Sequence, residues 1–205
     1  MRKGTTTDWM AGSLTVGLSI VILARLVEGP GDRVSVALQA TARWSFVQFW
    51  LGYTGHALAA LFAPRFHDLA QRTRDFGLSF ASAHLAHLAL VAWVLISATT
   101  PTPRSFLILF GTGVFWTYLL ALLSVRSIAA RFDPKVLRVL RTVGVDYIAL
   151  LFLIDFAKSP SQYDIVHLLF YSVVYVPFIV LAVAGPLLRL AALVKRVSST
   201  RRLAA

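Results

Sequence analysis

The sequence predicts an all-α integral membrane protein, a bundle of about six transmembrane helices. Hydrophobic residues make up 58% of the 205 positions and charged residues only 14%, whereas about a quarter of a soluble domain is charged. A mean hydropathy of +0.73 points the same way. Apolar runs near the length of about 20 residues that a spanning helix needs recur along the chain. Lipid is therefore the expected solvent for much of the surface.

Six apolar segments are expected to form the helices. They are Trp9–Leu26, Phe46–Phe62, Phe76–Ala98, Phe106–Val125, Val139–Phe156 and Ile165–Ala184. The first, second and fifth are short for a full span, and the fifth carries Asp146 and Asp155, so five spans plus one interfacial helix is the alternative. Pro177 lies inside the sixth segment, where its missing backbone donor predicts a kink.

Helix-breaking residues separate the segments. They are Glu28–Arg33, Pro64, Thr99–Pro103, Asp133–Pro134 and Ser159–Pro160. Proline has no backbone donor and disfavours helix at the residue before it, so each of these stretches predicts a stop. The whole chain, 1–205, is read as one transmembrane domain, with residues 1–8 and 186–205 as short basic tails.

The net charge of +11 is interpreted as topological. If the N-terminus is cytoplasmic, most of the 20 Lys and Arg residues fall on the cytoplasmic side, as the positive-inside rule requires. Both termini are then cytoplasmic. The expected location is the inner (plasma) membrane, multi-pass, with the lipid bilayer as partner. Because the basic residues cluster at the ends of apolar segments, no nucleic-acid partner is expected.

Histidines inside apolar segments are the first candidates for function, because a polar side chain in hydrocarbon is costly. His56 lies in the second segment, and His84 and His87 share one face of the third. If the two helices are antiparallel neighbours, the three rings lie at similar depths toward the cytoplasmic side. A haem, a proton path and a buried polar contact all suit that geometry. Asp155 and His167 form a second, outer polar layer.

The absence of cysteine limits the chemistry. Disulfides, thiolate nucleophiles, thioether-attached haem and cysteine-held iron–sulfur clusters are excluded. Histidine remains as the one good ligand for haem iron or another transition metal.

The stretch from Arg72 to His87 resembles a helix of the ferric-reductase-like transmembrane domain superfamily. In that family a basic turn leads into Gly-Leu, and a histidine haem ligand follows about ten residues later, a spacing that Gly77 and His87 keep. Thr41–Leu58 is similar to the family's preceding helix, and Ser124–Tyr147 to its basic loop and fifth helix. The nearest likeness is to bacterial members such as the haem membrane subunits of methionine sulfoxide reductase systems.

The resemblance implies a membrane haem b protein for transmembrane electron transfer, a component of a membrane oxidoreductase. His87 would ligate the iron, with His56 or His84 in the second axial position. Arg72 and Arg74 would contact the haem propionates. No flavin or nicotinamide domain is seen in this chain, so electrons would come from quinol or a separate reductase and pass to a periplasmic redox partner.

One departure from the family keeps two other hypotheses open. Family members place two histidines on the fifth helix, and here the matching positions lie near Val143 and near Asp155 or Phe156. The first alternative is therefore a structural or accessory membrane subunit without a cofactor. The second is a small proton-coupled transporter that uses His56, His84 and Asp146.

Overall fold

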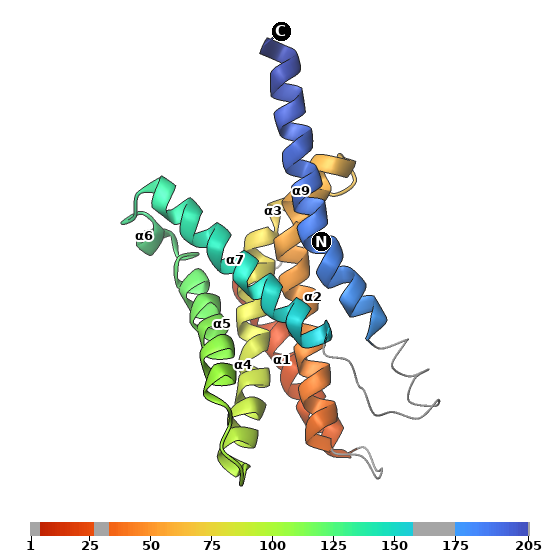
Figure 1. The fold of residues 1–205 in the computed structure, drawn as a ribbon, viewed down its shortest axis with the longest axis vertical. Coiled ribbons are helices and arrows are strands. Elements are labelled where there is room, and N and C mark those ends of the chain that lie inside the picture. Colours follow the sequence, from red (N-terminus) through yellow and green to blue (C-terminus); the bar gives the residue numbers. More distant parts are fainter. Residues whose placement is uncertain (1–4, 27–32, 158–174, 205) are drawn as a thin grey trace.

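The computed structural model describes residues 5–26, 33–157 and 175–204. Helices are the only regular secondary structure in these ranges, which confirms the predicted all-α class (Figure 1). Six helices in these ranges are long. They are α1 (Thr6–Leu26), α2 (Arg33–Phe62), α4 (Thr73–Ser97), α5 (Arg104–Leu122), α7 (Pro134–Ala157) and α9 (Val176–Ala204). Two short helices, α3 (His67–Gln71) and α6 (Arg126–Ala129), lie in the connections.

Four of these helices are long and apolar enough to cross a membrane. The candidate spans are Thr6–Ala24, Thr73–Ser97, Arg104–Leu122 and Val176–Ser199. Helices α2 and α7 are also long, at 30 and 24 residues, but they are not among these candidate spans. Helix α2 begins about 13 residues before the predicted Phe46, so it takes in Arg33 and Arg43.

Local signals explain several helix ends. At the start of α1, Thr5 N–H donates to Asp8 Oδ2 at 2.7 Å and Asp8 N–H donates to Thr5 Oγ1 at 3.3 Å, the reciprocal arrangement of a capping box. Asp133 accepts the Lys135 N–H at 2.7 Å and so caps α7. Pro134 then occupies the first helical position, where no backbone donor is needed.

The C-terminal part of the chain differs from the prediction. Residues 158–174, which include His167 and part of the expected sixth segment, lie outside the described ranges. The helix continues far beyond Ala184, to Ala204, so the expected tail is helical. Pro177 is the second residue of α9 and introduces no kink there, because a proline in the first turn removes no helical bond. Pro186 is the proline inside this helix.

Long helices that follow one another along the chain alternate in direction. Contacts between α2 and α4 are antiparallel, with His56 beside Thr73 and Thr41 beside His87. In the same way, α4 and α5 are joined at their ends by the bond from Arg74 Nε to the Ser124 carbonyl.

The remaining pairs complete the alternation. Between α5 and α7, a Cβ at Gly144 would meet Trp116, and the hydroxyl of Tyr147, further along α7, donates to the carbonyl of Leu109, which comes earlier on α5. These two helices are therefore antiparallel. Between α7 and α9, Asp146 meets Arg189. One end of the bundle therefore holds the starts of α1, α4 and α7 and the ends of α2, α5 and α9. We call it the basic end.

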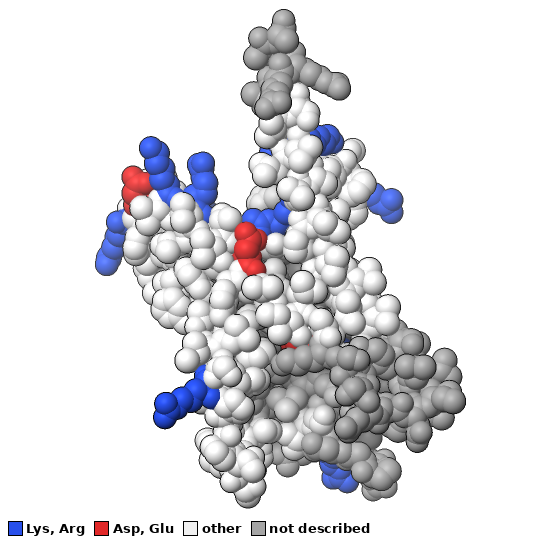
Figure 2. All heavy atoms as spheres, viewed as in Figure 1, with Lys and Arg blue, Asp and Glu red and all other residues white. Residues whose placement is uncertain are grey.

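The basic end carries most of the described Lys and Arg side chains (Figure 2). They are Arg65, Arg72, Arg74, Arg126, Arg131, Lys135, Arg138, Arg141, Arg189, Lys195 and Arg196. Helix α9 extends past the other helices there (Figure 1). The grouping agrees with the predicted charge asymmetry.

An aromatic core joins α2, α4, α7 and α9 at mid-height. Phe46 is 1% exposed, and its ring lies 5.0 Å from Phe152 and 4.9 Å from Phe156, edge-on in both cases. Phe49 contacts Phe80 and Phe152 in the same cluster. Between lipid-embedded helices, close packing of this kind replaces the hydrophobic effect as the main source of cohesion.

Glycines allow several of the helices to approach closely. A Cβ at Gly113 would lie 2.2 Å from Leu151 Cδ1, and one at Gly17 would lie 3.1 Å from Ala86 Cβ. Gly111, two residues before Gly113, has open space instead. Close helix packing therefore explains the glycine at position 113.

Candidate functional site

A groove of about 990 Å³ opens at the basic end between α2, α4, α5, α7 and α9. Its apolar wall includes Phe49, Phe80 and Leu120. Its charged and titratable lining residues are His56, Arg74, Arg141, Asp146, Arg189 and Arg196. Four guanidinium groups thus face one carboxylate, so the groove has an apolar body and a cationic mouth. Binding sites for small molecules are typically of this size and mainly apolar.

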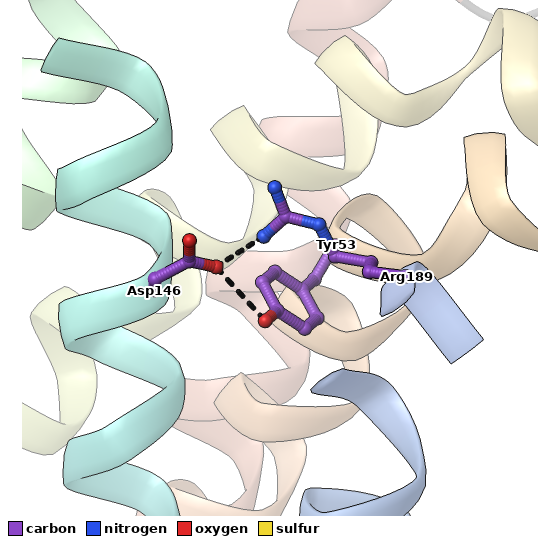
Figure 3. Close-up of polar contacts among 3 residues, drawn as sticks. All are labelled: Tyr53, Asp146 and Arg189. Atoms are coloured by element: carbon purple, nitrogen blue, oxygen red, sulfur yellow. Dashed lines mark hydrogen bonds and ion pairs between the residues drawn. The ribbon is translucent and has the colours of Figure 1, made fainter. Parts of the chain in front are cut away.

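Asp146 is the centre of a contact between three helices (Figure 3). Tyr53 of α2 donates its hydroxyl to Asp146 Oδ1 at 2.9 Å, and Arg189 of α9 forms an ion pair with the same oxygen. The Arg189 guanidinium also lies 4.4 Å from the centre of the Tyr53 ring, within cation–π range. The carboxylate is therefore neutralised by Arg189, and a pairing of Asp146 with Arg141 or Arg74 is not found.

Arg74 and Arg141 reach the end of α5. Arg74 Nε donates to the Ser124 carbonyl at 3.1 Å, and Arg141 Nη2 donates to the Leu123 carbonyl at 2.9 Å. The last carbonyls of a helix have no partner within it and carry partial negative charge. Two arginines from α4 and α7 satisfy them here, and this fixes both side chains at the groove wall.

Arg72 lies away from the groove. Its guanidinium is 5.5 Å from the ring of Trp9, at the interface with α1. Of the two arginines expected near haem propionates, Arg74 lines the groove and Arg72 does not.

His84 and His87 form a separate layer halfway along α4. Their ring centres are 5.3 Å apart and the rings are stacked, with 26° between the planes. His87 Nδ1 lies 3.1 Å from Thr41 Oγ1 of α2, and Asp155 of α7 is close enough to His87 to interact electrostatically. The Phe80 ring, which lines the groove, lies beside His84 with 5.3 Å between ring centres and a tilt of 36° between the planes. Neither histidine lines the groove.

His56 does not join the other two histidines. Its Nε2 lies 3.2 Å from Thr73 Oγ1, at the first residue of α4, and its side chain is exposed in the groove. From Thr73 to His84 is 11 residues, or about 16 Å along the helix axis. His84 and His87 come together, as their spacing predicts, whereas His56 opens onto a different site.

The different depth of His56 has a simple cause. The predicted similar depths assume that the end of the second segment, Phe62, is level with the start of the third, Phe76. In the structure α3 lies between the two helices, and α4 already begins at Thr73. A Cβ at Gly55 would lie 2.6 Å from Thr73 Cγ2 and 3.3 Å from the Leu69 carbonyl. Helix α2 therefore overlaps α3 for its last two turns, and His56 is displaced toward the basic end.

Tyr53, Arg141, Arg189 and Arg196 are not among the site residues predicted from the sequence, in which Arg189 and Arg196 count only toward the charge asymmetry. Arg189 had a usable signal, because it is a lone arginine inside the apolar run of residues 176–194. Among the described residues, no three His, Asp or Glu side chains are placed to share a metal ion. Comparison of the chain with protein-family models, with curated proteins and with solved structures found no match.

Proposed function

We propose that this chain is a six-span protein of the inner membrane, with the basic end in the cytoplasm, and that its groove binds an amphipathic anion. Four apolar helices of spanning length and the alternating direction of all six long helices support the topology. The clustering of Lys and Arg at one end supports the orientation. Helices α2 and α7 complete the six because both are long and pack against the spanning ones.

The topology can be tested by cysteine labelling, because the native chain has no cysteine. Ser127→Cys lies in α6 at the basic end, and Ser105→Cys lies in the first turn of α5 at the opposite end. We expect a membrane-impermeant maleimide to label Ser105→Cys in intact spheroplasts and Ser127→Cys only after permeabilisation. The reverse pattern, or labelling of both in intact cells, would contradict the orientation or the spans between them.

The cationic mouth of the groove is the observation that carries the ligand proposal. Arg74, Arg141, Arg189 and Arg196 line it, while Asp146 is its one described carboxylate. Guanidinium groups bind carboxylates and phosphates through paired hydrogen bonds. An acidic headgroup at the arginines would leave an apolar body against Phe49, Phe80 and Leu120. Haem b, with its two propionates, and an acidic phospholipid both have this chemistry.

The placement of the histidines limits how haem would be held. His87 and His56 lie in different layers, and His84 and His87 lie on one face of one helix, so neither predicted pair lies on opposite sides of one porphyrin. The bis-histidine arrangement does not fit. His56 is the histidine that faces the groove, so it is the residue we assign to iron, with Arg74 and Arg141 toward the propionates. Haem would supply one-electron chemistry at this site.

The test distinguishes the two ligand classes. The protein, purified in mild detergent after haem-replete expression, is analysed by its reduced-minus-oxidised spectrum and by native mass spectrometry. A haem b signal that His56→Ala removes and His67→Ala retains identifies haem in the groove. His67 is the matched control because it is exposed on α3, outside the groove lining.

Without a haem signal, a co-purifying acidic phospholipid supports the proposal if it depends on the arginines. We expect the double variant Arg141→Gln/Arg196→Gln to lose it and Arg131→Gln, outside the groove at the same end, to keep it. Two results would refute the groove proposal. The first is that neither haem nor an acidic phospholipid co-purifies with the protein. The second is a haem signal that disappears in His87→Ala and persists in His56→Ala.

A further inference from the structure

A second line of polar residues runs through the bundle, away from the groove, where α1, α2 and α4 meet. Five of its side chains are at most 6% exposed: Ser13, Thr41, Ser45, Gln48 and Ser79. Asp75 lies one turn before Ser79 on α4, and His84 and His87 follow it along the same helix. We call these polar residues together the polar seam. Its members are Asp75, Ser79, His84 and His87 of α4, Thr41, Ser45 and Gln48 of α2, and Ser13 of α1.

Three buried polar atoms in the polar seam have no hydrogen-bond partner within the described part of the chain. They are Gln48 Oε1, Ser79 Oγ and His84 Nδ1. The antiparallel register that pairs Thr41 with His87 and His56 with Thr73 places Gln48 near the level of Ala81. The three atoms thus fall within about 8 Å along the axis of α4. Buried polar atoms in proteins are almost always paired, with protein or with ordered water.

The rest of the α1–α2–α4 interface contrasts with these three atoms. Thr41 and Ser45 bond carbonyls of their own helix, and Ser82 donates to the Met10 carbonyl of α1 at 2.9 Å. The first two are bonds within α2 and the third joins two helices, so all three side chains are satisfied. A fourth buried atom without a partner in the described residues, Arg43 Nε, lies on the side of α2 that faces Tyr175, whereas these three lie at neighbouring levels of the polar seam. Together the three would supply the several polar partners that a bound water needs.

His87 is oriented as a proton acceptor. The Thr41 hydroxyl donates to the Ala37 carbonyl at 2.8 Å, so its oxygen is left to accept a hydrogen bond from His87 Nδ1–H at 3.1 Å. In the neutral ring Nε2 then carries the lone pair. Nε2 takes up a proton to give the imidazolium, and the same nitrogen then releases a proton to the next acceptor, which restores the neutral ring with Nδ1–H still bonded to Thr41.

Charged groups stand at both ends of this line. At the basic end, Asp75 accepts a hydrogen bond from Thr6 Oγ1 at 2.7 Å. In the opposite half, Asp155 of α7 interacts electrostatically with His87. Arg43, the cation of α2 nearest this level, stacks on Tyr175 at 4.4 Å and so turns toward α9.

We propose that the polar seam is a proton-transfer path through the membrane, from Asp75 through the Ser79 hydroxyl and bound water, which Gln48 orients, to His84, His87 and Asp155. Each step moves one proton between a donor and an acceptor, with no net redox change. The proposal rests on the spanning topology above, but not on the ligand of the groove.

Proton flux tests the proposal directly. The full chain is reconstituted into phosphatidylethanolamine–phosphatidylglycerol vesicles that contain a pH-sensitive dye, and a valinomycin-clamped potassium gradient drives proton uptake. We expect flux above that of empty vesicles, and about a hundredfold less in His84→Gln or His87→Gln, the scale of a positioned proton donor or acceptor. Gln48→Leu, which leaves both rings in place, should also reduce it.

His67→Gln is the matched control, because it alters an exposed histidine of α3 that lies outside both the polar seam and the groove lining. We expect it to retain the wild-type flux. Size-exclusion elution and helical circular dichroism confirm that each variant is folded. Flux of the wild type equal to that of empty vesicles, or equal flux in wild type and both histidine variants, would overturn the proposal. Cysteine labelling reports separately on the topology.

Discussion

The groove at the basic end and the histidine layer in the middle of the bundle both join helices through polar side chains, but one is open to solvent and the other is buried. Asp146 and Arg189 of the groove have side chains that are 48% and 31% exposed. In the middle layer, Thr41 is fully buried, and the rings of His84 and His87 stack on each other. The aromatic core around Phe46, Phe49 and Phe80 lies between them.

The comparison shows that exposure sets what each polar contact contributes. An ion pair near solvent contributes little to stability, because water and salt screen it. A polar atom in the interior costs more when its partner is removed, because nothing replaces that partner. The groove is therefore suited to binding an external ligand, and the middle layer to a fixed internal arrangement. The predictions below test this contrast.

The largest effect is expected at the aromatic core that separates the two regions. Phe46→Ala removes a ring that packs on Phe152 and Phe156, and should lower the free energy of unfolding by about 3–5 kcal/mol, as for other buried phenylalanines. Unfolding in mixed detergent micelles, followed by circular dichroism, measures this. Phe115→Ala, at a ring that is 59% exposed, should change the free energy far less. Equal costs would mean that the core is not packed as described.

The next effect is expected in the middle layer. Thr41→Val keeps the side-chain volume but removes the acceptor for His87 Nδ1–H, and should cost about 1–2 kcal/mol. Thr112→Val is the control, because the Thr112 hydroxyl bonds only Ile108 O of its own helix. In a double-mutant cycle with His87→Leu, a coupling energy near zero would show that the Thr41–His87 contact carries no stability.

A smaller and salt-dependent effect is expected in the groove. Asp146→Asn removes the charge that pairs with Arg189, and should cost about 0.5–1 kcal/mol in low salt. Raising the ionic strength to about 1 M, where the Debye length is about 3 Å, should remove most of that difference. Asp68→Asn, on α3 away from the groove, serves as the control. A salt-independent loss would mean that Asp146 behaves as a buried group.

The sequence was sufficient for the features that depend on one helix at a time. Composition, apolar runs and breakers predicted the helical class, and the i, i+3 spacing correctly placed His84 and His87 together. The prediction that His56 lies at their depth was wrong, because that depth depends on the register of α2 against α4. A short helix between them moved that register by more than two turns, and no local pattern encodes such a shift. Arg189 was missed for a related reason, since the predicted end at Ala184 removed it from the bundle.

Gly77 offers the smallest effect on stability and the finest test of the groove. It is the glycine on which the family resemblance depends, yet a Cβ there would meet no heavy atom within 4 Å, and the residue lines the groove. Packing therefore gives no reason for a glycine. Gly77→Ala should stabilise the protein by about 0.5–1 kcal/mol, because alanine is the better helix former. Gly144→Ala should instead destabilise the protein, because its Cβ would lie 2.7 Å from Trp116.

The informative measurement on Gly77→Ala is ligand content, made on the same purified samples by spectrum and native mass spectrometry. If the open space over Gly77 is where the apolar body of the ligand lies, the added methyl group lowers occupancy while the free energy of unfolding rises. Gly111→Ala, which also has open space but lies outside the groove, should raise stability and leave the ligand unchanged. Unchanged occupancy in both variants would place the ligand elsewhere in the groove, away from α4.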